Sequence, residues 1–240
     1  MRSPEPTNVR VRESPRAQRL RITVRPDAPP ELVVPSGTTR PEIDRMLRAN
    51  RDWIARKSAE LAAREANRPQ LGLDRPGVVW VHGQPVEVIR RPGSRSVARL
   101  TRGRLLVAGP RSEATGAIER WYRREAKARI SQVVAREGTA LGVEPGPVSV
   151  RDQRTRWGSC SPTGTLSFSW RLLLAPYEVL DYVVVHELCH LRELNHSRRF
   201  WGLVAEARPD WRTQSGWLRV HGAQIGAYTT EHTASRTFRD

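Results

Sequence analysis

The segment from Val183 to Leu191 has residue types and a spacing that could bind a metal ion and activate water. His186 and His190 are four residues apart within it. Residues at this spacing lie on one face of a helix, so both imidazole rings can point toward one cation. Glu187 is turned away by ~100° on the helix and could accept a proton from a metal-bound water. The pattern is typical of a catalytic zinc site, which keeps one coordination position open.

A third histidine follows the first two at a workable distance. His196 comes six residues after His190, and Asn195 tolerates the left-handed backbone with which many helices end. The chain can therefore turn and return His196 to the metal. We expect His186, His190 and His196 to bind one zinc ion, Zn²⁺. Glu193, one helical turn beyond His190, is the alternative third ligand.

The spacing of the three histidines matches the long zinc-binding pattern of metzincins, except that Glu193 stands where that pattern has glycine. Metzincins also have a methionine turn downstream, whereas the methionines of this chain are Met1 and Met46. The sequence therefore excludes a metzincin proper. Cys189 lies between the histidines and is expected to pack in the core.

The elements that must position these residues follow from hydrophobic periodicity. The second half of the chain predicts a long amphipathic helix, two short strands and three further helices. We expect the strand from Thr165 to Trp170 to offer its edge to an extended peptide. The predicted helices cover about 112–138, 179–191, 197–207 and 212–225, and the predicted strands cover about 148–150 and 166–170.

The first half of the chain is dominated by strand patterns. Leu20 to Val24 alternates apolar residues with arginines, and turn sequences at His82–Pro85 and Thr101–Arg104 predict two hairpins. One helix is expected to begin near Pro41. The sequence thus predicts an α+β fold. Its expected parts are a flexible N-terminus (1–17), a β-rich region with one helix (18–110), a metal-binding domain of a small sheet and helices (111–226) and a flexible tail (227–240).

The composition is that of a charged globular chain. Hydrophobic residues make up 38% of its 240 residues, which excludes wholesale disorder. No run approaches the ~18 apolar residues of a membrane span, and no secretory signal is visible. The two cysteines cannot form a disulfide framework. We therefore expect a cytoplasmic protein without membrane contact.

The charge balance bears on the choice of partners. The 41 Lys and Arg residues exceed the 25 Asp and Glu residues, for a net charge of +16. This charge favours nonspecific, salt-dependent contact with nucleic acid. The arginines are scattered along the chain, which weighs against a dedicated nucleic-acid surface. Hydrolysis of a nucleotide is a further alternative, although the sequence has no Gly-rich phosphate loop.

Four residues near the metal-binding pattern are candidates for substrate contacts: Arg156, Trp157, Trp170 and Tyr182. Arg156 and Tyr182 could donate a hydrogen bond to the oxyanion of a tetrahedral intermediate, and His221 is a further candidate for that donor. Trp157 and Trp170 either line the substrate cleft or pack in the core. Core packing is also the alternative for Tyr182.

The string from Arg156 to Ser161 and the motifs that follow it resemble the YgjP-like metallopeptidase family. Proteins of this family are predicted zinc-dependent hydrolases related to SprT-type zincins, and the similarity runs through most of the chain. The motifs that carry the resemblance are Arg156-Trp157-Gly158-Ser159-Cys160-Ser161, Ser169-Trp170-Arg171-Leu172, Ala175-Pro176, Val179 to Leu191, and Asn195-His196-Ser197 with Phe200-Trp201.

The resemblance implies a zincin-like fold for 111–226 and a specific set of site residues. It implies that His186, His190 and His196 bind zinc and that Glu187 is the catalytic base of a metallopeptidase, so that the partner is a peptide or protein substrate. SprT-type relatives act on proteins bound to DNA. A protease for DNA-bound proteins is therefore an alternative.

Overall fold

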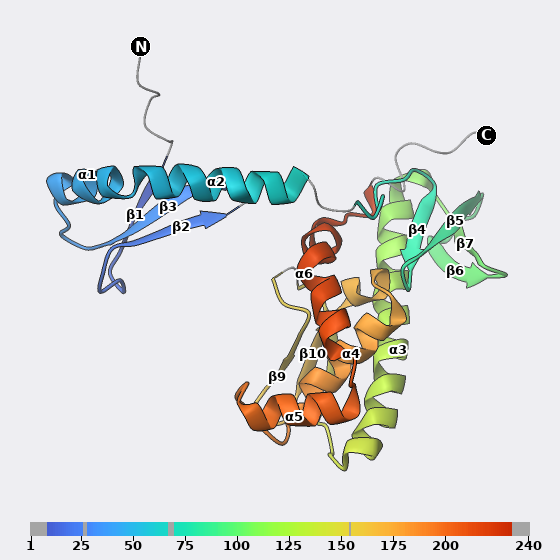
Figure 1. The fold of residues 1–240 in the computed structure, drawn as a ribbon. Helices are drawn as coiled ribbons and strands as arrows, with labels where there is room; N and C mark the ends of the chain where they lie inside the picture. The colour runs from blue at the N-terminus through green and yellow to red at the C-terminus, as the bar shows by residue number, and fades with distance from the viewer. Residues whose placement is uncertain (1–8, 26–27, 67–69, 154, 232–240) are drawn as a thin grey trace. The chain divides into compact units, whose positions relative to one another are not determined.

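The computed structural model describes residues 9–25, 28–66, 70–153 and 155–231 (Figure 1). By their internal contacts, the residues form two compact units, 1–68 and 69–240. The described residues contain three small sheets and six α-helices. The fold is therefore α+β, as the sequence predicts.

The first unit combines a three-stranded sheet with two helices. The sheet has the order β1–β3–β2, and β3 pairs in parallel with β1 and antiparallel with β2. Leu32 and Val34 of β3 and Ile54 of α2 are buried and form its interior. The elements are β1 (Arg10–Ser14), β2 (Arg21–Arg25), β3 (Ala28–Pro35), α1 (Arg40–Ala49) and α2 (Arg51–Ala66).

Two features of this unit differ from the expectation. Residues 10–14, expected within a flexible N-terminus, form β1 because parallel pairing with β3 satisfies their backbone groups; residues 1–8 lie outside the described residues. In place of one helix near Pro41 there are two. The side-chain amide of Asn50 donates to the Met46 carbonyl at 2.8 Å, and α1 ends there.

The second unit begins with a four-stranded sheet of order β4–β5–β7–β6. Both predicted hairpins are present, with β4 antiparallel to β5 and β6 antiparallel to β7. Their tight turns place His82, Gly83, Arg102 and Gly103 at positive φ, as two-residue hairpin loops often require. The strands are β4 (Val78–Val81), β5 (Gln84–Arg91), β6 (Val97–Thr101) and β7 (Arg104–Ala108).

Helix α3 (Ala114–Leu141), preceded by a 3₁₀ turn at Arg111–Glu113, connects this sheet with the rest of the second unit. It contacts β6 and β7 and also β8 (Val148–Arg151) and α4 (Tyr177–Cys189). The hydroxyl of Tyr122 on α3 donates to the Trp80 carbonyl at 2.9 Å. The strands before residue 110 thus belong to the same compact unit as the metal-binding motif, whereas the sequence pattern places a boundary near residue 110.

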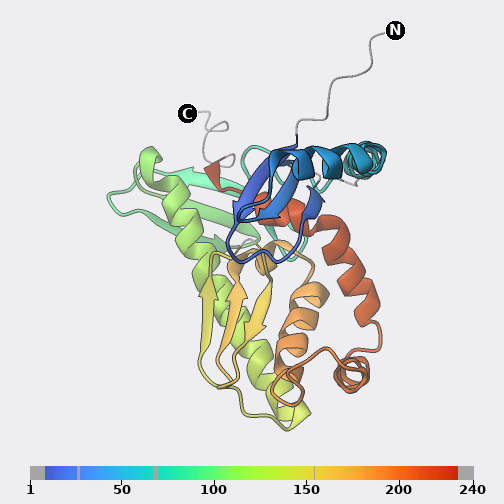
Figure 2. The same cartoon turned by 90° about the vertical axis from the view of Figure 1, so that its left-hand side faces the viewer.

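The remaining sheet has the order β8–β10–β9 and lies beside the helix of the metal-binding motif (Figure 2). Its central strand β10 pairs in parallel with β8 and antiparallel with β9. The expectation that Thr165–Trp170 offers a free edge is therefore wrong, because both of its sides are paired. The unpredicted strand β9 lies at the sheet edge. The other elements are β9 (Gly158–Cys160), β10 (Leu166–Ser169), a 3₁₀ turn (Trp170–Leu174), α5 (Arg198–Ala207) and α6 (Trp211–Ala227).

The core of the second unit draws on α3, α4 and β10 and extends beyond the last helix. The expected tail, 227–240, starts at the last residue of α6, and the next residue, Tyr228, is only 4% exposed. Residues 232–240 of that segment lie outside the described residues. None of the described helices is long and apolar enough to cross a membrane.

Candidate metal centre

Helix α4 carries the His-Glu-x-x-His pattern as a largely buried element. Its apolar residues Val183, Val184 and Leu188 are buried. Glu187 and His190 are also buried, although both are polar. Polar groups removed from water are costly unless they find partners, so a specific role for these two side chains is indicated.

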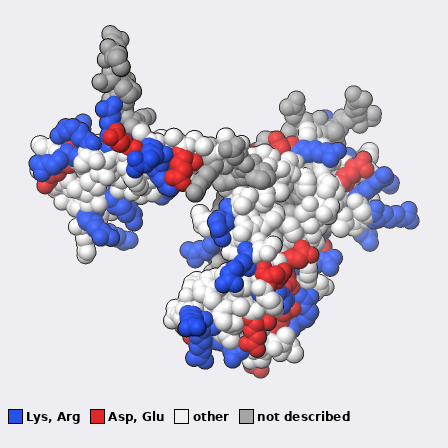
Figure 3. Space-filling model, viewed as in Figure 1, with Lys and Arg blue, Asp and Glu red and all other residues white. Residues whose placement is uncertain are grey.

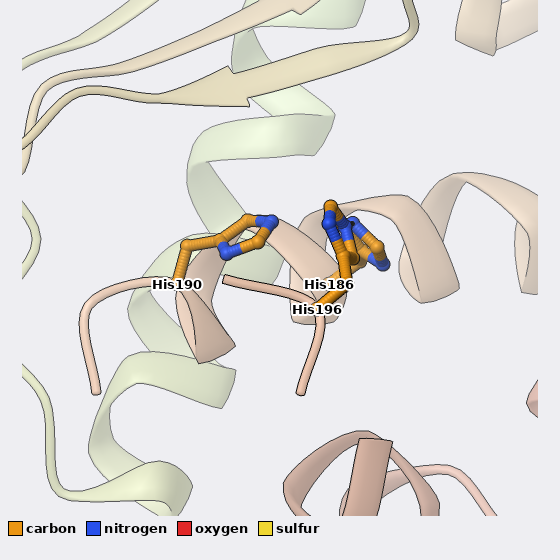
Figure 4. Close-up of side chains that lie close together, drawn as sticks. All are labelled: His186, His190 and His196. Atoms are coloured by element: carbon orange, nitrogen blue, oxygen red, sulfur yellow. Dashed lines mark hydrogen bonds between the residues drawn. The ribbon is translucent and has the colours of Figure 1, made fainter. Parts of the chain in front are cut away.

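His186, His190 and His196 come together, and we call them the histidine cluster. One nitrogen of each ring lies within 4.8 Å of the others. In Figure 4 the ring of His190 lies to one side of the overlapping rings of His186 and His196. His186 lies on α4, His190 is the residue that follows this helix, and His196 lies in the loop before α5. The Nε2 atoms of His186 and His196 are 3.1 Å apart. Among the described residues, the group of potential ligands contains His196 and not Glu193.

The protonation of the rings suits metal binding. Nδ1 of His190 lies 3.0 Å from the carbonyl oxygen of Glu193. A carbonyl only accepts, so Nδ1 carries the proton and Nε2 keeps its lone pair for a metal. Burial, together with the two neighbouring histidines, lowers the pKa of His186 to about 3. Its ring is therefore neutral near pH 7, which is the form that binds metals. The donor set fits zinc or another divalent cation that favours imidazole.

The side chain of Glu187 occupies a slot beside strand β9. A Cβ atom at Gly158 would lie 2.6 Å from both Cγ and Oε1 of Glu187. The carboxylate accepts the backbone N–H of Cys160. Burial raises the pKa of Glu187 to about 7, although Arg156 and the Cys160 N–H act in the opposite direction. A carboxyl group with this pKa can both accept and release a proton near neutrality.

Two of the four substrate-contact candidates border this slot. Arg156 is exposed, and its charge acts to lower the pKa of Glu187. Trp157 is partly exposed and lies against Gly222 of α6, where a Cβ atom would be 3.2 Å from its ring. Both residues directly precede β9 in the chain.

The other two candidates are buried. Trp170 is 1% exposed, its ring lies 6.3 Å from that of Tyr228, and its Nε1–H donates to Asp152 at 3.0 Å. Tyr182 is 5% exposed, one turn before His186 on α4, and its side chain is hydrogen-bonded to Ser215. Trp170 thus packs in the core, and Tyr182 lies between α4 and α6.

Two further residues, Gly158 and Phe200, touch the site although neither was among the expected site residues. Gly158 leaves the space that Glu187 fills, and a glycine within a strand is a known signal of close approach. Phe200 is completely buried and its ring lies beside all three imidazoles. Nothing in its spacing distinguishes it from any other buried residue of an amphipathic helix.

The site can be compared with known proteins. Residues 18–221 match the YgjP-like, metallopeptidase domain family. The crystal structure of the metallopeptidase zymogen of Pyrococcus abyssi abylysin matches with 26% sequence identity and a TM-score of 0.32, over 38% of this chain and 91% of that chain. No curated protein matches the sequence.

Proposed function

The chain belongs to the YgjP-like metallopeptidase family, and we propose that it is a zinc peptidase whose metal is bound by the histidine cluster. The observation that supports this proposal is the convergence of three imidazoles next to the buried carboxyl group of Glu187. Structural zinc sites are usually closed by four protein ligands. The described residues bring three together, which leaves a position for water, as a catalytic site needs.

The residues of the chain suit peptide hydrolysis. When bound, zinc supplies Lewis-acid chemistry, which makes water more acidic and polarises a carbonyl group. Glu187 accepts the proton of the attacking water on its carboxylate and returns it to the leaving amine. The space at Gly158 and the N–H of Cys160 hold this carboxylate in one orientation.

The edge of β9 supports a peptide as the substrate. Backbone groups of Trp157 and Ser161 bond to the segment that contains β10. Hydrogen-bonding positions alternate along an antiparallel strand, so Gly158 and Cys160 direct their backbone groups to the other side. The N–H of Cys160 meets Glu187 there. An extended peptide that pairs along this edge would bring its carbonyl groups close to the catalytic carboxylate.

The proposal is tested by Glu187→Gln, which keeps the shape of the side chain but removes its ability to take a proton. We expect zinc content to stay at one ion per chain and cleavage of a fluorescence-quenched peptide library to fall by roughly 10²–10⁴-fold. Metal content is measured by atomic emission and cleavage by fluorescence.

Glu178→Gln is the matched control, because Glu178 lies on the same helix but is exposed. It should cleave peptides as the wild type does. Retention of zinc with unchanged cleavage in Glu187→Gln would contradict the assignment of the base. A wild type that binds no zinc would contradict the metal site itself.

A second candidate is a peptidase that acts on proteins bound to nucleic acid. This candidate is favoured by a cluster of arginines in the first unit. A hollow of about 620 Å³ is bordered by Arg12, Arg16, Arg19 and Arg21. Arg19 and Arg21 also border a hollow of about 400 Å³ with Trp53, which is 41% exposed. Basic grooves with exposed aromatic rings suit single-stranded nucleic acid.

A further inference from the structure

We propose that Phe200 is a positioning residue of the metal site, whose ring is the wall that orients all three imidazoles of the histidine cluster. This inference rests on the proposed role of the cluster as the metal-binding site. It assigns to an apolar side chain the orienting function that hydrogen bonds usually have at metal centres.

The ring of Phe200 lies beside each member of the histidine cluster. It stacks on His190, with ring centroids 4.4 Å apart and planes inclined by 25°. It meets His186 edge to face at 4.9 Å and 73°, and His196 at 4.8 Å and 69°. These separations are those of favourable aromatic pairs. The ring of Trp201 also lies near His186 and His196, at 5.7 Å from each, but the ring of Phe200 is nearer to both and contacts His190 as well.

Hydrogen bonds do not fully orient the cluster. Within the part of the chain that the structure describes, His190 is the one member of the cluster that donates a ring N–H to a protein carbonyl, that of Glu193. Nδ1 of His186 is buried and has no hydrogen-bond partner among the described residues. His196 is exposed, and the bond given for its ring joins it to His186. The orientation of His186 and His196 must therefore come from packing.

The start of α5 holds Phe200 and His196 in a fixed relation. Ser197 is the N-cap residue of this helix, and its hydroxyl accepts the backbone N–H of Phe200 at 3.3 Å. Phe200 is 0% exposed, and Trp201 packs on its edge with ring centroids 5.1 Å apart. The cap thus links the loop that carries His196 to a rigid, buried ring one turn later.

This arrangement should act on metal affinity more than on folding. Imidazoles already set at the right tilt lose less conformational freedom when they bind a cation. A ring bound to a divalent cation also carries part of its charge, which the face of an aromatic ring attracts. Loss of the Phe200 ring should weaken metal binding even in a chain that folds.

The test compares Phe200→Leu and Phe200→Met with Val204→Ala in the full-length protein. Val204 is the matched control, because it lies one turn later on α5 and is also 0% exposed, without a ring contact to the cluster. Zinc affinity is measured by competition with a fluorescent chelator, and site geometry by the visible spectrum of the Co²⁺-substituted protein. Circular dichroism of the apo form identifies which variants fold.

We expect each folded Phe200 variant to bind zinc 10–100-fold more weakly and to show an altered Co²⁺ spectrum. Val204→Ala should stay within threefold of the wild type. The inference is overturned if either Phe200 variant folds and binds zinc within threefold of the wild type with an unchanged spectrum. If the His196→Ala variant binds zinc as tightly as the wild type, the proposed ligand set is wrong. That result differs from an unchanged Phe200 variant, so a failure of the proposed function and a failure of this inference are distinguishable.

Discussion

At the scale of single residues, the position of the Glu187 carboxyl group depends on the absence of a side chain at Gly158. Glu187 fills the space next to Gly158, and a Cβ atom there would come within 2.6 Å of its Cγ and Oε1. Real atoms do not approach so closely, so an alanine would displace the carboxylate. The glycine is needed for space, since its φ is not in the left-handed region.

We therefore predict that Gly158→Ala lowers kcat/KM for peptide cleavage about a hundredfold, because misplacing a reacting group by ~1 Å has an effect of this size. Zinc affinity should change little, because the three atoms nearest to the added Cβ all belong to Glu187 and none to the histidine cluster. Steady-state kinetics and chelator competition measure the two quantities.

The control is Gly202→Ala on α5, where a Cβ atom would meet nothing within 4 Å. It should keep full activity and gain up to about 1 kcal/mol of stability, because alanine favours a helix. Equal losses of activity in the two variants would show that the slot beside β9 is not what matters.

At the scale of elements, an ion-pair network ties α3 and α4 to the end of α5. Arg208, the C-cap of α5, bonds to Glu137 of α3 at 2.8 Å and to Asp181 of α4 at 2.5 Å. Arg136 of α3 also pairs with both carboxylates. Both carboxylates are buried, so each depends on these partners. The network therefore fixes α5, and with it Phe200, against the helix that carries two of the histidines.

Glu137→Gln should destabilise the protein by roughly 1.5–3 kcal/mol at pH 7, the range for hydrogen bonds to charged groups. Burial acts to raise the pKa of Glu137, but the bonds from Arg208 and Arg136 hold it below the usual 4.5. A depressed pKa gives stability that is present above the unfolded-state value and is lost as the pH falls through the folded-state value. The deficit of the variant should therefore shrink below about pH 4.5.

Urea unfolding of the wild type and variant across this pH range measures the difference. Glu125→Gln is the control, since Glu125 lies on the same helix and pairs with Arg129 in a more exposed, i,i+4 position. Such pairs contribute roughly 0.3–0.5 kcal/mol. A deficit for Glu137→Gln that is independent of pH would exclude the ionic explanation.

At the scale of the whole molecule, charge is spread over both units, as the Lys and Arg side chains of Figure 3 show. The net charge of +16 would attract any polyanion. In the first unit, four arginines border one hollow, and two of them also border a second hollow with an exposed tryptophan. Two variants that each lose four arginines, one at these hollows and one elsewhere, distinguish a local nucleic-acid-binding surface from attraction by net charge.

Changing Arg12, Arg16, Arg19 and Arg21 together to glutamine should weaken binding of a fluorescent oligo-dT at 100 mM NaCl by at least tenfold. An arginine that contacts a phosphate releases counterions from the nucleic acid, and the variant has fewer such arginines. The decrease of its binding affinity with salt concentration should therefore be less steep. Fluorescence anisotropy measures both effects.

The matched variant changes four exposed arginines of the second unit, Arg91, Arg95, Arg99 and Arg102, and should lose less than threefold. Equal losses in the two variants would mean that the protein binds nucleic acid through net charge alone. In that case the peptidase for nucleic-acid-bound proteins has no support from this surface.

The sequence by itself was sufficient for the features that depend on residues close along the chain. The four-residue spacing of His186 and His190 predicted their common helix face, and the two tight turns predicted both hairpins. The α+β class and the helices of the second half follow from the same periodicities. Local patterns predict these features because helices and tight turns depend on nearby backbone and side-chain contacts.

Only the tertiary structure decided what surrounds the reacting groups. Strand β9 pairs with β10 at the sheet edge, and Gly158 leaves space for Glu187 of another element. The ring of Phe200 on α5 lies beside His186 of α4, so this contact also depends on how two elements pack. The division into units at residue 68 likewise depends on α3 covering the strands that precede it. Such contacts arise when whole elements pack, and periodicity along one element carries no information about which other element it will meet.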